Sequence, residues 1–159
     1  MPKIHFKIVT PEKTAFEDEV DQVTLPVTDG QITILPNHTS YIASLKAGEI
    51  CFKKRNEETV LATSGGFVEF DKNELVFLAD TAERIEEIDV EEAEKAKSRA
   101  EELMKTRETM DDQEYARVAA AIEHESNRIK VARKHYTKKG INLTYLRNHL
   151  PCHIIEIIA

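Results

Sequence analysis

The sequence predicts a mixed β and α fold: an antiparallel β-sandwich over residues 1–84, then an antiparallel two-helix hairpin over 85–138. Short alternating apolar runs with frequent turn residues continue as far as Asp80, which is typical of a β-sandwich. From Glu86 onward, apolar or small residues recur at spacings of three and four, which indicates amphipathic helices. About 80 residues are enough for a small sandwich core. Residues 139–159 form an extension of unknown role.

The predicted strands follow one another closely. In chain order they are Lys3–Val9, Val20–Val27, Glu49–Lys54, Thr59–Thr63, Phe67–Phe70 and Glu74–Ala79. In the first of them, alternate residues are apolar, as expected of a half-buried strand. The paired glycines of Ser64-Gly65-Gly66 predict a bulge or bend where a strand crosses between layers.

The stretch Gly30–Gly48 forms a corner between strands. Asp29-Gly30 is a turn signal, because glycine adopts backbone angles that other residues avoid. Pro36 ends the apolar run that follows, since proline has no N–H to donate to a sheet. We therefore expect His38 to face outward at the end of a β-layer.

The helical part has clear N-cap residues and a predicted helix–helix contact that is rich in alanine. Asp89 is the predicted N-cap of the first helix, and Asp111-Asp112 breaks the pattern and caps the second. The predicted stripes are Val90, Ala93, Ala96, Ala100, Leu103 and Met104, then Tyr115, Val118, Ala119, Ile122, Ile129 and Ala132. Alanine contributes little hydrophobic energy per contact, so the hairpin is expected to be marginally stable and able to open.

Composition and charge exclude several classes of function. The net charge of −7 argues against non-specific binding to nucleic acid or to anionic lipid. No run approaches the roughly 18 apolar residues of a membrane helix, so membrane association requires a partner. Cys51 and Cys152 form no paired pattern, which favours a reducing compartment. The sequence contains no Gly-rich phosphate loop, nucleophile elbow or paired-carboxylate motif, so a non-enzymatic protein is expected.

Two stretches resemble signatures of the epsilon subunit of F-type ATP synthases. The first is GQITILPNHTSYIASLKAGEI, and the second combines Ser64-Gly65-Gly66-Phe67 with Leu78-Ala79-Asp80-Thr81-Ala82-Glu83. The resemblance covers roughly residues 3–138. It implies a non-catalytic rotor subunit of a proton-translocating synthase, at the cytoplasmic face of the bacterial membrane. The implied partners are the gamma subunit, the ring of c subunits, and the alpha and beta subunits, and Gln31 and His38 are the expected ring contacts.

The second helix ends in a basic segment that includes Arg128, Lys130, Arg133 and Lys134. One interpretation is that these cations stabilise the negative end of the helix dipole. The other is an acidic protein partner, because complementary charge sets the register of an interface. The resemblance favours the second, since it implies contact with an acidic loop of the beta subunit that inhibits ATP hydrolysis.

A nucleotide site is the alternative that the resemblance leaves open. Some bacterial family members bind ATP through Ile-Asp, two variable residues, and Arg-Ala; here Ile88, Asp89 and Ala93 match, with Glu92 in place of arginine. An acid there repels phosphate, so no cofactor is expected and Asp89 is interpreted as a helix cap. If ATP binds, Glu83 and Arg99 are further ligands, and the chain is an ATP-sensing module. A free-standing adaptor is the other alternative.

The extension, Gly140–Ala159, departs from the family pattern. It is equally consistent with an added strand, a docking peptide or a disordered tail. His149, Cys152 and His153 lie within it, but their spacing with no second cluster does not predict a metal site.

Overall fold

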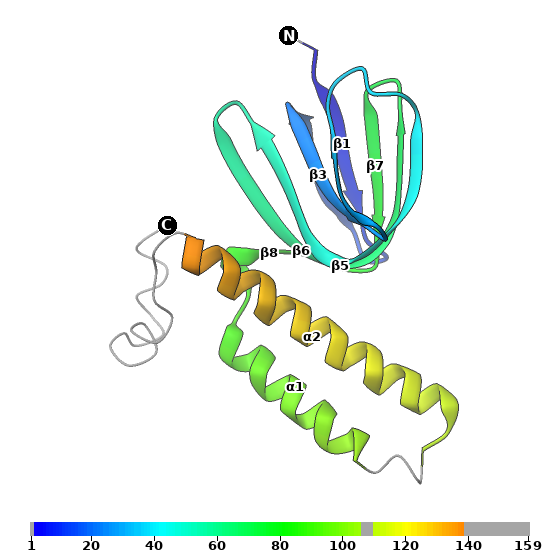
Figure 1. Ribbon diagram of the computed structural model, residues 1–159, viewed down its shortest axis with the longest axis vertical. Coiled ribbons are helices and arrows are strands. Elements are labelled where there is room, and N and C mark those ends of the chain that lie inside the picture. The colour runs from blue at the N-terminus through cyan, green and yellow to red at the C-terminus, as the bar shows by residue number, and fades with distance from the viewer. Residues whose placement is uncertain (1, 106–109, 139–159) are drawn as a thin grey trace.

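The computed structural model describes residues 2–105 and 110–138 as a β-sandwich and a helical hairpin (Figure 1). The strands are β1 (Ile4–Val9), β2 (Thr14–Val20), β3 (Gln22–Val27), β4 (Gly30–Ile34), β5 (Tyr41–Lys54), β6 (Glu57–Asp71), β7 (Glu74–Ala79) and β8 (Ala82–Arg84). A short 3₁₀ helix, η1 (Ile85–Glu87), leads to helices α1 (Val90–Met104) and α2 (Asp112–Lys138). The predicted fold class is confirmed.

The strands pair in the order β2-β1-β7-β6-β5-β3-β4, and β8 adds to β6. Every pairing is antiparallel except that of β1 with β7, where Phe6 lies opposite Leu75 in a parallel register. A parallel pairing between distant strands has no local turn to announce it. The sequence therefore predicts the strands but not this junction.

Three features of the strands differ from the prediction. The expected strand Val20–Val27 is divided at Asp21, where β2 ends and β3 begins. β2 was not predicted at all, because its sequence carries Glu17, Asp18 and Glu19. It is an edge strand, and charged residues on an edge discourage pairing with other chains. β5 is also longer than expected, since it begins at Tyr41 and not at Glu49.

The predicted bend at Gly65-Gly66 is confirmed. Both residues have positive φ, at 120° and 138°. Before the bend β6 pairs with β8 over Leu61–Thr63, and after it β6 pairs with β7 over Gly66–Asp71. A Cβ on Gly66 would lie 2.0 Å from the Leu78 carbonyl oxygen. The glycines thus let the long strand β6 pair with β8 before the bend and with β7 after it.

The sandwich encloses a continuous apolar core. Its largest fully buried side chains are Phe6, Phe70 and Phe77. Phe6 also contacts the rings of Phe16 and Phe52, with centroids 5.6 Å away in each case. This core is built from strand residues alone, so it does not depend on the helices for its apolar contacts.

The hairpin has the predicted caps. Asp89 Oδ1 accepts from the Glu92 amide at 3.0 Å, and Asp111 Oδ1 accepts from the Glu114 amide at 2.7 Å. Leu103 departs from its predicted stripe, since 55% of it is exposed. It lies in the last turn of α1, at the hairpin end that points away from the sandwich (Figure 1). In the described residues, no helix has the length and apolar character needed to cross a bilayer.

Candidate functional site: the interface between helix α2 and the sandwich

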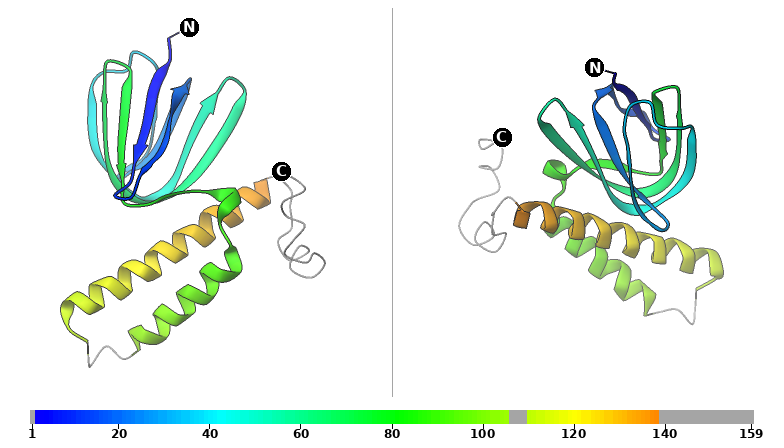
Figure 2. Two further views of the ribbon diagram at one scale, coloured as in Figure 1. Left: turned by 180° about the vertical axis from the view of Figure 1, so that it is seen from behind. Right: turned by 45° about the horizontal axis from the view of Figure 1, so that its top comes forward.

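Helix α2 lies between the sandwich and α1, as the two views in Figure 2 show, and it contacts β5, β6 and η1. The base of this interface is a small apolar cluster, separate from the sandwich core. Its buried members are Val60, Ala62, Ile85, Ile88, Val131 and Ala132. Two of these six side chains are alanines, and polar contacts with the sandwich add to the attachment.

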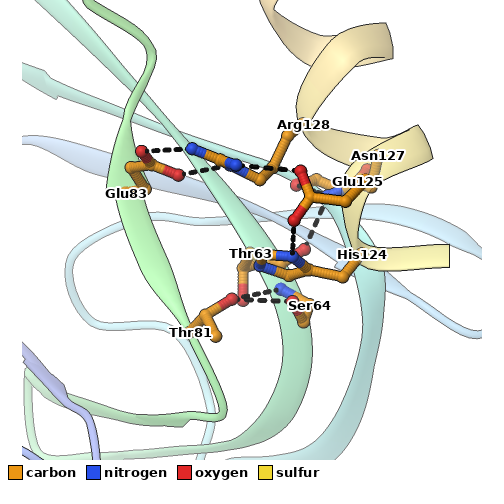
Figure 3. Close-up of polar contacts among 9 residues, drawn as sticks. Thr63, Ser64, Thr81, Glu83, His124, Glu125, Asn127 and Arg128 are labelled. Atoms are coloured by element: carbon orange, nitrogen blue, oxygen red, sulfur yellow. Dashed lines mark hydrogen bonds and ion pairs between the residues drawn. The ribbon is translucent and has the colours of Figure 1, made fainter. Parts of the chain in front are cut away.

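Asn127 fixes the position of α2 along the two long strands. Its amide nitrogen donates to the Thr63 carbonyl oxygen at 2.8 Å (Figure 3). The same nitrogen donates to the Gly48 carbonyl oxygen at 3.4 Å. Thr63 lies opposite Gly48, just before the bend of β6. A side chain that donates to two facing strands sets the register of the helix on the sheet.

Arg128 forms the most extensive polar contact of the interface. Its Nε and Nη2 donate to the two carboxylate oxygens of Glu83, at 2.7 and 2.9 Å, and its Nη1 donates to Glu125 at 2.8 Å (Figure 3). Side-chain exposures of 19% for Arg128 and 29% for Glu83 place the pair partly out of water. The Glu83 hydrogen bonds raise the pKa of Arg128, although burial opposes the shift. Such bidentate, charge-assisted pairs are stronger than ordinary hydrogen bonds.

The other predicted basic contacts lie along the same part of α2. Lys134 pairs with Glu49 of β5, and Arg133 pairs with Glu94 of α1. Lys130 is exposed and forms no ion pair within residues 2–105 and 110–138. Three of the four cations assigned to a partner are therefore held by the chain's own carboxylates. Sequence reasoning missed these acceptors, because no local pattern connects them to α2.

The residues considered for ATP are not gathered around one space. Asp89 caps α1, Ile88 and Ala93 are buried in packing contacts, and Arg99 is exposed on α1. Both carboxylate oxygens of Glu83 accept hydrogen bonds from Arg128. The surrounding residues, Ala62, Thr63, Ser64, Thr81, His124 and Asn127, leave essentially no free volume. In the described chain, Asp89 thus serves as a helix cap and Ile88 and Ala93 serve in packing, and ATP binding by this set stays a prediction.

Gln31 and His38, the two residues expected to contact the ring of c subunits, lie in different environments. Gln31 is exposed on β4 and lines a hollow of about 290 Å³ that Lys134 and Glu49 also border. His38 packs edge-on against Tyr41 and Phe70, with ring centroids 6.3 and 6.0 Å away. Its Nδ1 donates to the Thr39 carbonyl oxygen at 2.8 Å.

An exposed apolar patch, which sequence reasoning missed, crosses three neighbouring strands. It consists of Ile42, Phe67 and Leu78, which are 74%, 65% and 55% exposed. Phe67 lies opposite Leu78, and Ile42 is diagonal to Phe67 because Ser44 lies opposite it. Alternation predicts which residues share a face of a strand but not which face is covered. Gathered exposed apolar side chains mark interaction surfaces.

No group of three or more metal-ligating side chains occurs in the described residues. His149, Cys152 and His153, considered for a metal, lie outside those residues. So does the whole extension from 139 to 159, and its three predicted alternatives stay open.

The sandwich and the hairpin each match the model of a known domain family. Residues 3–85 match the beta-sandwich domain of the ATP synthase delta/epsilon chain, and residues 86–133 match its long alpha-helix domain. The chain therefore belongs to the delta/epsilon family of ATP synthase subunits.

Individual relatives indicate which type of subunit within the delta/epsilon family this chain is. The ATP synthase epsilon chain of Desulforamulus reducens is 42% identical over 125 residues, covering 79% of this chain and 93% of the relative. That of Halalkalibacterium halodurans is 35% identical over 132 residues, covering 83% and 98%. A chain of the Euglena gracilis mitochondrial ATP synthase shares the fold, with a TM-score of 0.66 at 18% identity and coverage of 80% and 79%. The chain is thus an epsilon-type, non-catalytic subunit, as the sequence resemblance predicted.

Proposed function

We propose that this chain works in the rotor of a proton-translocating ATP synthase, where the sandwich binds the central stalk and the hairpin restrains ATP hydrolysis. The observation that carries the proposal is the separation of two surfaces. The sandwich carries an apolar patch, and helix α2 carries a cationic segment. One surface suits a permanent contact and the other suits a reversible, charge-guided contact.

The apolar patch is the proposed docking surface for the gamma subunit. Ile42, Phe67 and Leu78 project from three hydrogen-bonded strands, so they are held by a rigid sheet. A rotor contact must transmit torque, and a rigid apolar surface meets that need without reordering side chains.

Replacing Phe67 with serine is expected to weaken gamma binding roughly ten-fold or more, because a central aromatic contact often dominates an interface. Binding of purified gamma subunit to the intact chain measures the effect. Leu103→Ser is the control, since Leu103 is also a largely exposed apolar residue, at 55% against 65% for Phe67, but lies on the hairpin. Equal gamma affinities for the two variants would contradict this docking surface.

The ring contact is proposed at Gln31 and His38. Gln31 is exposed, whereas His38 is half-buried by its aromatic neighbours and keeps a fixed ring orientation. Through the ring of c subunits the chain would be held at the cytoplasmic face of the bacterial membrane, peripherally and without inserting into it.

The cationic segment of α2 is the proposed brake, acting on an acidic loop of the beta subunit in the alpha–beta catalytic core. Support comes from its charge and from its attachment. The interface with the sandwich combines a small apolar cluster with ion pairs and hydrogen bonds. The ion pairs of α2 can be exchanged for similar ion pairs with an acidic partner, because complementary charge guides both contacts.

Lys130 offers a test that leaves the folded hairpin intact. We expect Lys130→Glu to raise ATP hydrolysis by the assembled complex roughly two- to five-fold, since it reverses a charge that faces the acidic partner. Lys130 is exposed and unpaired in the described residues, so the free energy of unfolding should change by only about 0.5 kcal/mol. Lys95→Glu on the exposed face of α1 is the control. Equal hydrolysis rates for both variants would argue against a brake at this segment.

A further inference from the structure

Three cations of α2 are held by acids that come from three different elements. Glu83 of β8 holds Arg128, Glu49 of β5 holds Lys134, and Glu94 of α1 holds Arg133. We call Glu49, Glu83 and Glu94 the acidic collar. It gathers around one helix three carboxylates from three different elements.

The collar occupies the same donors that an acidic partner would need. The guanidinium of Arg128 uses Nε, Nη1 and Nη2 in its contacts with Glu83 and Glu125. A second carboxylate cannot bind the same edge of the guanidinium until Glu83 leaves, because the bidentate geometry is already filled. Arg133 and Lys134 are likewise directed toward the chain's own carboxylates.

We propose that the acidic collar is an internal competitor: it occupies Arg128, Arg133 and Lys134 until an acidic protein surface displaces it. The identity of that surface as the beta subunit rests on the proposed function, but the competition does not. The apparent affinity for an acidic partner is reduced by the fraction of molecules in which the cations are occupied. The collar therefore sets the threshold at which α2 is released.

The proposal predicts opposite effects for the two sides of one ion pair. Removing the charge of Glu83 weakens the attachment of α2 and frees Arg128, so binding of an acidic ligand becomes tighter. Removing the charge of Arg128 also weakens the attachment, but it removes a donor that the ligand needs. Because loss of any nearby acid also favours binding of an anion, the competition is tested by the excess effect of Glu83 over that of an acid outside the collar.

The test uses the full chain and a fluorescein-labelled deca-glutamate peptide at low ionic strength, where charge contacts are least screened. Fluorescence anisotropy measures peptide binding, and amide hydrogen exchange over residues 124–136 measures the attachment of α2. We expect Glu83→Gln to bind the peptide roughly three- to ten-fold tighter than the unmodified chain, with faster exchange. We expect Arg128→Gln to exchange faster but to bind more weakly.

Glu87→Gln is the matched control. It removes the same single charge from an exposed residue of η1, and Glu87 has no ion pair in the described residues. Equal peptide affinity for Glu83→Gln and Glu87→Gln would overturn the proposal, and so would weaker or undetectable binding by Glu83→Gln. Glu49→Gln repeats the test at Lys134 and should also tighten binding. The isolated chain suffices, so failure of the collar is distinguishable from failure of the brake, which is measured by hydrolysis.

Discussion

Gly66→Ala is expected to destabilise the sandwich by about 3 kcal/mol or more, a large part of the total stability of a small domain. Two effects add. The φ of 138° is unfavourable for any residue with a Cβ, and the new Cβ would lie 2.0 Å from the Leu78 carbonyl oxygen. Because the obstacle is backbone and not a flexible side chain, β6 and β7 would have to separate. Urea denaturation of the full chain measures the loss.

Gly30 provides the control for this prediction. Its φ of 142° is nearly the same as that of Gly66, but no atom lies within 4 Å of a Cβ built on it. Gly30→Ala therefore reports the conformational effect alone, expected at about 1 kcal/mol. If the two variants lose equal free energy of unfolding, the close approach of β7 to Gly66 does not constrain the sequence.

The features that the sequence predicts well are encoded locally. The caps at Asp89 and Asp111 depend on a side chain three residues before the amide it accepts from, so they are visible in a short window. The bend at Gly65-Gly66 is similarly local, because it requires a backbone conformation that glycine adopts most easily.

The features that the sequence does not predict depend on distant partners or on exposure. β1 and β7 pair in parallel, although most of the sandwich residues lie between them in the sequence. The edge strand β2 is half-exposed and highly charged, so it lacks the apolar alternation by which strands are detected. Likewise, Phe67 has the character of a core residue in the sequence, and only the fold shows that it is exposed.

The candidate site was also only partly predictable from the sequence. The four cations of α2 are evident as a basic segment, but their acceptors are not. Arg128 and Glu83 are 45 residues apart, and Lys134 and Glu49 are 85 apart. For the residues considered for ATP, a local motif match is present, but the structure gives one of them another role: the carboxylate of Asp89 caps helix α1.

Removing the hairpin by ending the chain after Glu87 is expected to raise ATP hydrolysis by the assembled complex roughly five-fold or more, which is the effect of a coupling free energy of ordinary size. The truncation removes every cation of α2 together with the helix that carries them. It leaves the sandwich core, whose apolar contacts come from strands alone. Val60, Ala62 and Ile85 become more exposed, but they belong to the separate cluster beneath α2.

The measurement that tests the account most directly is therefore the hydrolysis rate of two complexes, one with the full chain and one with the chain ending at Glu87. Binding of the gamma subunit by both chains is the control, because it shows that the truncated sandwich still docks. A higher hydrolysis rate with the truncated chain is the predicted result. If the truncated chain assembles normally and the rate is unchanged, the hairpin is not a brake and the cations of α2 serve only to hold it against the sandwich.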